Sequence, residues 1–169
     1  MISLRQTKPR TLVGVDPLRS KIMRAVRRTD TTPELVVRKL VHALGFRFRL
    51  QRKDLPGTPD LVLPRLNTVI FVHGCFWHRH ASCAKATMPK TRVEFWHEKF
   101  DANTSRDARK NRQLRTAGWR VIVIWECETS DSVKLSRRLR SLLSSKRTSF
   151  LRGARHSRKT GPTLPARRR

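Results

Sequence analysis

The sequence has no apolar run long enough to cross a bilayer and no apolar stretch typical of a signal peptide. Cysteine is scarce, with 3 in 169 residues, and this odd number argues against the disulfide framework of a secreted domain. Acidic residues are also few, since 12 Asp and Glu oppose 39 Lys and Arg. These absences predict an intracellular protein with an anionic partner.

The formal net charge of +27 indicates that the partner is a polyanion. So positive a surface attracts DNA or RNA, and a membrane surface is the rival anion. We favour nucleic acid because the sequence offers no membrane-spanning segment.

Composition divides the chain into three regions. Residues 1–16 mix Arg, Lys, Thr, Pro and Gly without periodicity, which predicts a flexible basic arm. Residues 146–169 are rich in Lys and Arg and contain no acidic residue, which predicts a disordered basic tail that attracts phosphates. Residues 17–145 are long enough to form one folded domain with its own core.

The central region combines helical and strand patterns. Thr32 is the expected cap of a helix over about 33–44, and Thr91 to Glu94 has the pattern of a capping box for a helix ending near Thr116. We also expect a helix over 17–28 and a last helix with Val133, Leu135, Leu139 and Leu142 on its apolar side. Strands are expected over residues 46–50, 60–63, 68–72 and 119–125.

The strands at 68–72 and 119–125 are apolar and should be buried on both faces. Helices around such a sheet predict an α/β protein with three α/β/α layers and a central mixed sheet.

Cysteine and histidine gather in one short block. Cys75, His80 and Cys83 have the spacing of metal ligands, and Cys127 follows the last expected strand. Three thiolates and one imidazole complete a tetrahedral zinc shell with no open position, which is typical of a structural site. Two alternatives remain open from the residues: Cys127 as a small buried apolar side chain, and His78 instead of His80 as the ligand.

A second group of residues suits phosphodiester chemistry. Asp60 stands at the start of a strand after a rigid turn, and the chain returns through a hairpin to His73. A carboxylate placed there can hold Mg²⁺ beside a phosphate, and His73 and His78 are candidate proton donors and acceptors. Each residue also has a structural reading: Asp60 as a turn residue, the histidines as hydrogen-bonding groups, and Glu34 as a favourable charge at a helix N-terminus.

The aromatic pair Phe76-Trp77 lies in this polar, ligand-rich loop. It is a candidate wedge between stacked bases, with packing in the core as the alternative.

Several segments carry a specific resemblance. Pro56-Gly57-Thr58-Pro59-Asp60, followed by Val69 to His78 with the string His-Gly-Cys-Phe-Trp-His, resembles the very-short-patch-repair (Vsr) DNA mismatch endonucleases. The similarity continues through Met88 to Trp96, Asn103 to Asp107 and Gly118 to Cys127, and it extends over about residues 17–143.

The resemblance implies a fold similar to restriction endonucleases. It implies a Mg²⁺-dependent nick in one strand beside the T of a T:G mismatch, the lesion left when 5-methylcytosine deaminates. On that pattern Asp60 and Val72 hold Mg²⁺, His78 activates water, His73 assists at the phosphate, and Glu34 supports His78. The resemblance also implies Zn²⁺ on Cys75, His80, Cys83 and Cys127, and a DNA wedge of Phe76, Trp77 and Met23.

Three positions depart from related patterns. Phe71-Val72-His73 stands where restriction-type nucleases carry an acidic-x-Lys motif, Val72 stands where Vsr proteins often have Thr, and one extra residue separates His80 from Cys83. Val can replace Thr if the ligand is its main-chain carbonyl.

We therefore expect a monomer in the bacterial cytoplasm, associated with the nucleoid. Its expected partners are T:G-mismatched double-stranded DNA and mismatch-repair proteins. Two alternatives stay open: a restriction-type nuclease with another target, and a non-catalytic zinc-stabilised DNA-binding protein.

Overall fold

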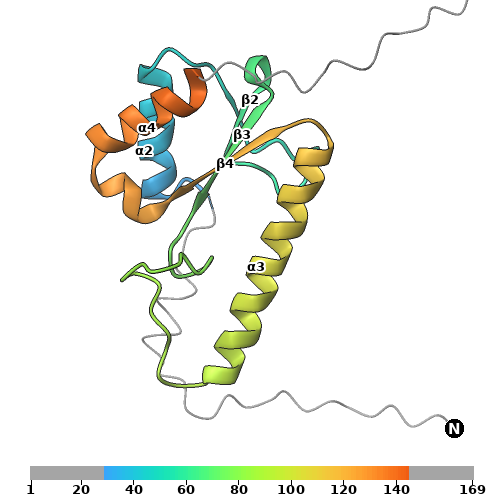
Figure 1. Ribbon diagram of the computed structural model, residues 1–169, viewed down its shortest axis with the longest axis vertical. Coiled ribbons are helices and arrows are strands. Elements are labelled where there is room, and N and C mark those ends of the chain that lie inside the picture. The colour runs from blue at the N-terminus through green and yellow to red at the C-terminus, as the bar shows by residue number, and fades with distance from the viewer. Residues whose placement is uncertain (1–28, 145–169) are drawn as a thin grey trace, which may run out of the picture.

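A computed structural model of the chain describes residues 29–144 as a four-stranded sheet with helices on both faces (Figure 1). The helices are α2 (Thr32–Ala43), α3 (Val93–Thr116) and α4 (Ser132–Ser144). The strands are β1 (Arg49–Leu50), β2 (Leu61–Leu63), β3 (Thr68–His73) and β4 (Arg120–Trp125), and two short 3-10 helices are η1 (Pro64–Leu66) and η2 (Glu126–Ser130). The predicted arm, the helix over 17–28 with Met23, and the basic tail lie outside the described residues.

The sheet is mixed, and its strand order is β1-β2-β3-β4. β2 and β3 form an antiparallel hairpin with Leu61 opposite Ile70, so residue 60 lies near the end of β3. β3 and β4 are parallel and pair His73 with Trp125. A parallel pair requires a crossover, which α3 provides. The start of β2 and the ends of β3 and β4 therefore meet at one end of the sheet.

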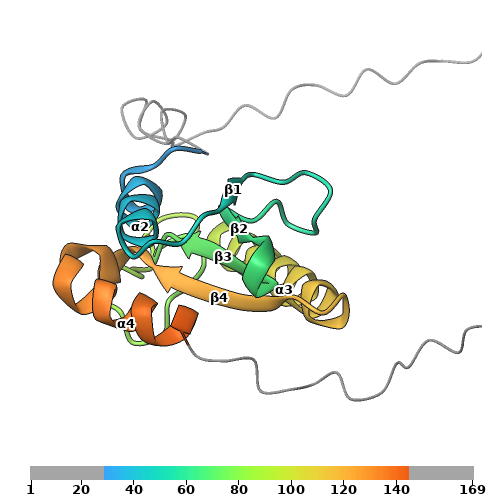
Figure 2. The ribbon, with the colours of Figure 1, turned by 90° about the horizontal axis from the view of Figure 1, so that it is seen from above.

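Helices α2 and α4 lie on one face of the sheet and α3 lies on the other (Figure 2). A separate apolar core lies on each face. On one face α2 and α4 pack on the sheet through residues such as Val37, Leu139 and Ile124. On the other face Leu114 of α3 packs against Val69 and its neighbours. This arrangement confirms the predicted α/β/α layers and the mixed sheet. Within residues 29–144, no helix is both long enough and apolar enough to span a membrane.

The hydrophobic pattern predicted the inner strand better than the outer one. Every residue of β3 except Val72 is buried, as its apolar sequence indicated. The same prediction for residues 119–125 is wrong, because only Ile122 and Ile124 of β4 are buried. Among the described strands β4 is an edge strand, which has a strand neighbour on one side alone.

The predicted element ends need four corrections. The N-cap of α2 is Thr31 instead of Thr32, and the strand expected over 46–50 is reduced to β1. No capping box forms at Thr91, because Arg92 is the cap of α3 and has φ 54° without a side-chain cap bond. In α4 the side chain of Val133 is 64% exposed, and Leu143 is buried with Leu135 and Leu139.

Candidate active site and metal centre

A cleft of about 920 Å³ opens at the end of the sheet where β2 begins and β3 ends. It brings together the four residues predicted to be catalytic, Asp60, His73, His78 and Glu34. The elements that carry these residues are the β2–β3 hairpin, α2 and the loop after β3, and all of them reach this end of the sheet. Three cationic side chains also line the cleft: Lys53, Arg106 and Lys110. The lining of the cleft thus combines carboxylates and imidazoles with cations.

Asp60 bridges the hairpin. Its Oδ2 accepts a hydrogen bond from the Val72 main-chain N–H at 2.7 Å. The carboxylate therefore contacts β3. If Asp60 were only a turn residue, its carboxylate would bond within its own turn. Burial raises the pKa of Asp60 to about 6, and the hydrogen bond from Val72 opposes this rise. Bound protons and bound cations compete for such a carboxylate, because both neutralise its buried charge.

The two histidines stack on each other beside Asp107. The ring centroids of His73 and His78 are 4.0 Å apart with an interplanar angle of 15°. Nδ1 of His78 lies 2.5 Å from Oδ2 of Asp107. Burial lowers the pKa of His73 to about 4, so this imidazole is neutral near pH 7. Burial alone would raise the pKa of Asp107, but the hydrogen bond and charge of His78 outweigh it and the pKa is lowered.

Asp107 is a site residue that the sequence reasoning did not single out. It lies on α3, inside the segment Asn103 to Asp107 that carried the resemblance, and the resemblance of this segment was the available signal. The structure pairs His78 with Asp107, whereas the prediction paired it with Glu34. The Glu34 carboxylate instead accepts hydrogen bonds from the Asp30 N–H, the Thr31 hydroxyl and Arg38, while Glu34 still lines the cleft.

The predicted metal ligands form a second cluster near the cleft. One ligand atom from each of Cys75, His80, Cys83 and Cys127 lies within 4.8 Å of the others. His80 Nδ1 is 3.7 Å from the Cys75 sulfur and 3.4 Å from the Cys127 sulfur. A tetrahedral zinc ion with ordinary bond lengths separates sulfur from nitrogen by about 3.5 Å. The cluster contains His80 and excludes His78, which lies in a separate group with His73 and Asp107.

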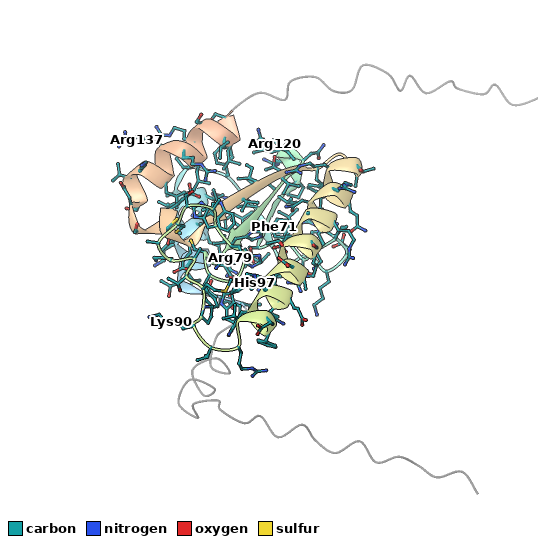
Figure 3. All side chains as sticks on the ribbon, turned by 60° about the horizontal axis from the view of Figure 1, so that its bottom comes forward. Phe71, Arg79, Lys90, His97, Arg120 and Arg137 are labelled. Carbon is teal, nitrogen blue, oxygen red and sulfur yellow. The ribbon has the colours of Figure 1, made fainter. Side chains whose placement is uncertain are left out.

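Polar contacts fix the loop of residues 74–92 that carries this cluster. Glu126 accepts a hydrogen bond from the Cys75 N–H at 3.3 Å and pairs with Lys85 at 3.1 Å. Arg79 donates to the carbonyls of Ala86 and Thr87, and its guanidinium lies 4.7 Å from the centre of the Phe100 ring on α3 (Figure 3). The loop has no helix or strand of its own, so these contacts and the cysteines define its shape.

The aromatic pair lies where this loop meets α3. The Phe76 ring packs edge-on against Trp77, Trp96 and Phe100, with centroids 5.1 to 5.4 Å apart. Phe76 and Trp77 are each half-buried, and Asn103 donates to the Trp77 carbonyl at 3.1 Å. The two rings thus have both packed and exposed surface, supported by a helix.

Trp125 connects the two clusters. Its ring stacks on His80 with centroids 4.2 Å apart and contacts His73 edge-on at 5.5 Å. A continuous series of rings therefore runs from His80 of the cysteine cluster through Trp125 to His73 and His78.

The chain is similar to one protein family and to several known proteins. One family profile, described as DNA mismatch endonuclease Vsr, matches residues 15–85. The type II nicking enzyme V.XorIIP of Xanthomonas oryzae pv. oryzae is 52% identical over 125 residues, which are 74% of this chain and 91% of that protein. DNA mismatch endonuclease Vsr of Escherichia coli is 45% identical over 118 residues, 70% of this chain and 75% of that protein. The type II nicking enzyme V.NmeAIP of Neisseria meningitidis is 42% identical over 125 residues, with coverage of 74% and 89%.

Proposed function

The chain belongs to the Vsr family of DNA mismatch endonucleases, and from this premise we propose that it nicks one DNA strand beside the T of a T:G mismatch in a Mg²⁺-dependent reaction. The family makes it a DNA endonuclease. The observation that carries the finer proposal is the convergence of Asp60, His73, His78 and Asp107 on one cleft beside the Cys/His cluster. The E. coli relative, named a DNA mismatch endonuclease, supports the choice of substrate.

The donors at Asp60 fit Mg²⁺. This ion prefers hard oxygen ligands and usually takes one or two carboxylates together with phosphate oxygens and waters. The Asp60 carboxylate and the main-chain carbonyl of Val72 are the proposed ligands, and the hydrogen bond between these two residues keeps them adjacent. Val serves as well as Thr here, because the proposed ligand is a carbonyl. A bound Mg²⁺ would polarise the scissile phosphate and stabilise the leaving oxyanion.

The two imidazoles are the proposed proton-transfer groups. Asp107 accepts a hydrogen bond from the Nδ1–H of His78, which leaves Nε2 of His78 with a free electron pair to take a proton from the attacking water. His73 is neutral and lies against His78, so it can donate a hydrogen bond to the phosphate without adding charge. Asp107 is thus a positioning residue, and His78 is the proposed general base.

We propose zinc for the cluster of cysteines with His80. Thiolate and imidazole donors are the usual structural zinc set, and the sulfur–nitrogen distances agree with tetrahedral geometry. The ion would fix the loop that holds His78 and the aromatic pair.

Phe76 and Trp77 are the proposed wedge, with Met23 assigned the same role from outside the described residues. A mismatch costs less to unstack than a paired step, so an inserted ring distinguishes the two energetically. The half-buried state of both rings supports this role, because the packed part anchors them and the rest can reach DNA.

The partners proposed are T:G-mismatched double-stranded DNA and mismatch-repair proteins, for a monomer that acts at the bacterial nucleoid in the cytoplasm. The direct test incubates the full chain and Mg²⁺ with two duplexes that differ only by C:G or T:G at one position. We expect one nick, in the strand carrying T. Shifted bands without cutting would indicate a binding protein, and cutting of both strands of paired DNA would indicate a restriction-type nuclease.

Asp107→Asn should reduce the single-turnover nicking rate by at least about 100-fold, because Asn cannot hold the Nδ1 proton of His78 as a carboxylate does. Duplex affinity should change little. Asp101→Asn is the matched control, since Asp101 lies exposed on the same helix. Equal rates for Asp107→Asn and Asp101→Asn would contradict the positioning role.

Trp77→Ala should lower the preference for T:G over C:G duplex by about tenfold, as expected from base–aromatic stacking of about 1–3 kcal/mol. Affinity for paired DNA should fall much less, and Trp77→Phe should keep most of the preference. The measurement is competition binding with both duplexes. Equal losses on the two duplexes would argue that Trp77 is a packing residue alone.

A further inference from the structure

The catalytic imidazoles and Asp107 also have the composition of a transition-metal site. One ligand atom from each of His73, His78 and Asp107 lies within 4.8 Å of the other two. In the described part of the chain this is the only group of its kind besides the one that contains the cysteines. It contains no thiol, so any ion that it bound would be held by nitrogen and oxygen alone.

The donor set selects a class of ion. Two imidazoles and one carboxylate suit zinc, copper, nickel or ferrous iron, whereas Mg²⁺ prefers oxygen ligands. Three protein ligands leave at least one position for water or a phosphate oxygen. The group therefore prefers other metal ions than the oxygen donors at Asp60. It also differs from the cysteine cluster, whose four ligands leave no open position on the ion.

The three donors are held in place by different elements. His73 ends β3 and is only 8% exposed. The His78 N–H bonds to the Gly74 carbonyl at 3.1 Å, and Asp107 is fixed on α3. Because the ligands are ordered before binding, little conformational entropy is lost when an ion enters. The cations Lys53, Arg106 and Lys110 line the same cleft and oppose the binding of any positive ion.

We propose that His73, His78 and Asp107 bind one borderline divalent ion, with Zn²⁺ as the representative, and that this binding inhibits the nuclease. The ion takes one nitrogen electron pair of each imidazole and replaces the proton held between Nδ1 of His78 and Asp107, and that proton moves to Nε2 of His78. Each ring then has one nitrogen on the ion and a proton on the other nitrogen, so neither ring can accept a proton from water. Binding follows from the geometry alone, whereas inhibition rests on the proposed function.

The test begins with full-length protein loaded with one equivalent of Zn²⁺, so that the cysteine cluster is filled. Titration calorimetry with further Zn²⁺ should then show a second, weaker binding step. Co²⁺ added in its place should give visible bands without sulfur-to-metal charge transfer, because the second site contains no thiol. Zn²⁺ at concentrations that fill this step should abolish nicking at constant excess Mg²⁺.

Two variants and one control assign the site. Asp107→Asn and His73→Gln should each weaken the second step by at least about tenfold while the first step is retained. His97→Ala, on the exposed surface of α3 (Figure 3), should keep both steps. Circular dichroism on each variant checks folding, and His78→Gln replaces any variant that unfolds.

The outcomes separate the two proposals. A second step that is absent in the wild type, or equally strong in Asp107→Asn and His73→Gln, overturns the metal site. Normal nicking of T:G duplex together with no second step overturns this inference and leaves the proposed function intact. A second step in a protein that does not nick T:G duplex even before the second site is filled supports the metal site and contradicts the proposed function. Nicking that persists with the second site filled overturns the inhibition.

Discussion

Replacing Asp60 with Asn should reduce the single-turnover nicking rate of a T:G duplex by about a thousandfold or more. The substitution removes the charge of the carboxylate proposed to hold Mg²⁺, and the contribution of the ion to transition-state stabilisation amounts to several kcal/mol. The amide introduced by Asp60→Asn can still accept the Val72 N–H through its oxygen, so the hairpin should fold normally. Removing a charge that is buried should even raise the midpoint of thermal unfolding slightly.

Asp54→Asn is the matched control, because Asp54 is an exposed carboxylate in the loop before β2. Its nicking rate should equal that of the wild type. Rates are measured with enzyme in excess over duplex and at several Mg²⁺ concentrations, and duplex affinity is measured separately. If Asp60→Asn nicked as fast as Asp54→Asn, the proposed Mg²⁺ ligand would be excluded.

The layers of the fold could be predicted because the pattern of apolar residues depends on burial. β3 is mostly apolar and is buried except at Val72, and the long helix α3 ends before Gly118 as the sequence indicated. β4 has an equally apolar sequence but is only partly buried, since burial also depends on where a strand stands in the sheet. That position follows from long-range pairing, which no local pattern records.

The site also contains residues that the sequence indicated and one that it did not. Cys75, His78 and His80 are close in sequence, so their spacing already indicated ligands and catalytic groups. Asp107 is 29 residues from its partner His78 and approaches it only because α3 crosses back over the sheet. A carboxylate in a charged helix has no local feature that distinguishes it from the exposed Asp101.

The proposed zinc cluster and the candidate catalytic cleft lie at the same two strand ends. His73 and Cys75 are two residues apart at the end of β3, and Trp125 and Cys127 are two residues apart at the end of β4. The pairing of His73 with Trp125 therefore places the cleft residue His73 and the proposed ligands Cys75 and Cys127 within two residues of the same level of the sheet. Disturbing either cluster should affect the other.

Loss of the metal should consequently have the largest effect on stability. Cys127→Ser or His80→Ala should lower the free energy of unfolding by about 4 kcal/mol or more, as is typical when a structural ion is lost, and should lower the thermal midpoint by roughly 15 °C. Burial raises the pKa of Cys75 to about 12, so without an ion this buried sulfur stays a protonated thiol, and zinc has to displace that proton when it binds.

Stability, zinc content and limited proteolysis of the loop should change together in these variants. Calorimetry gives the midpoint, atomic absorption gives the zinc content, and proteolysis reports on residues 74–92. His97→Ala is the control for His80→Ala, because it removes an exposed imidazole outside both clusters. The loop carries His78 and the aromatic pair, so nicking should fail even though Asp60 is unchanged. A variant that lost zinc but kept its midpoint and its resistant loop would show that β3, β4 and α3 position the catalytic groups without the ion.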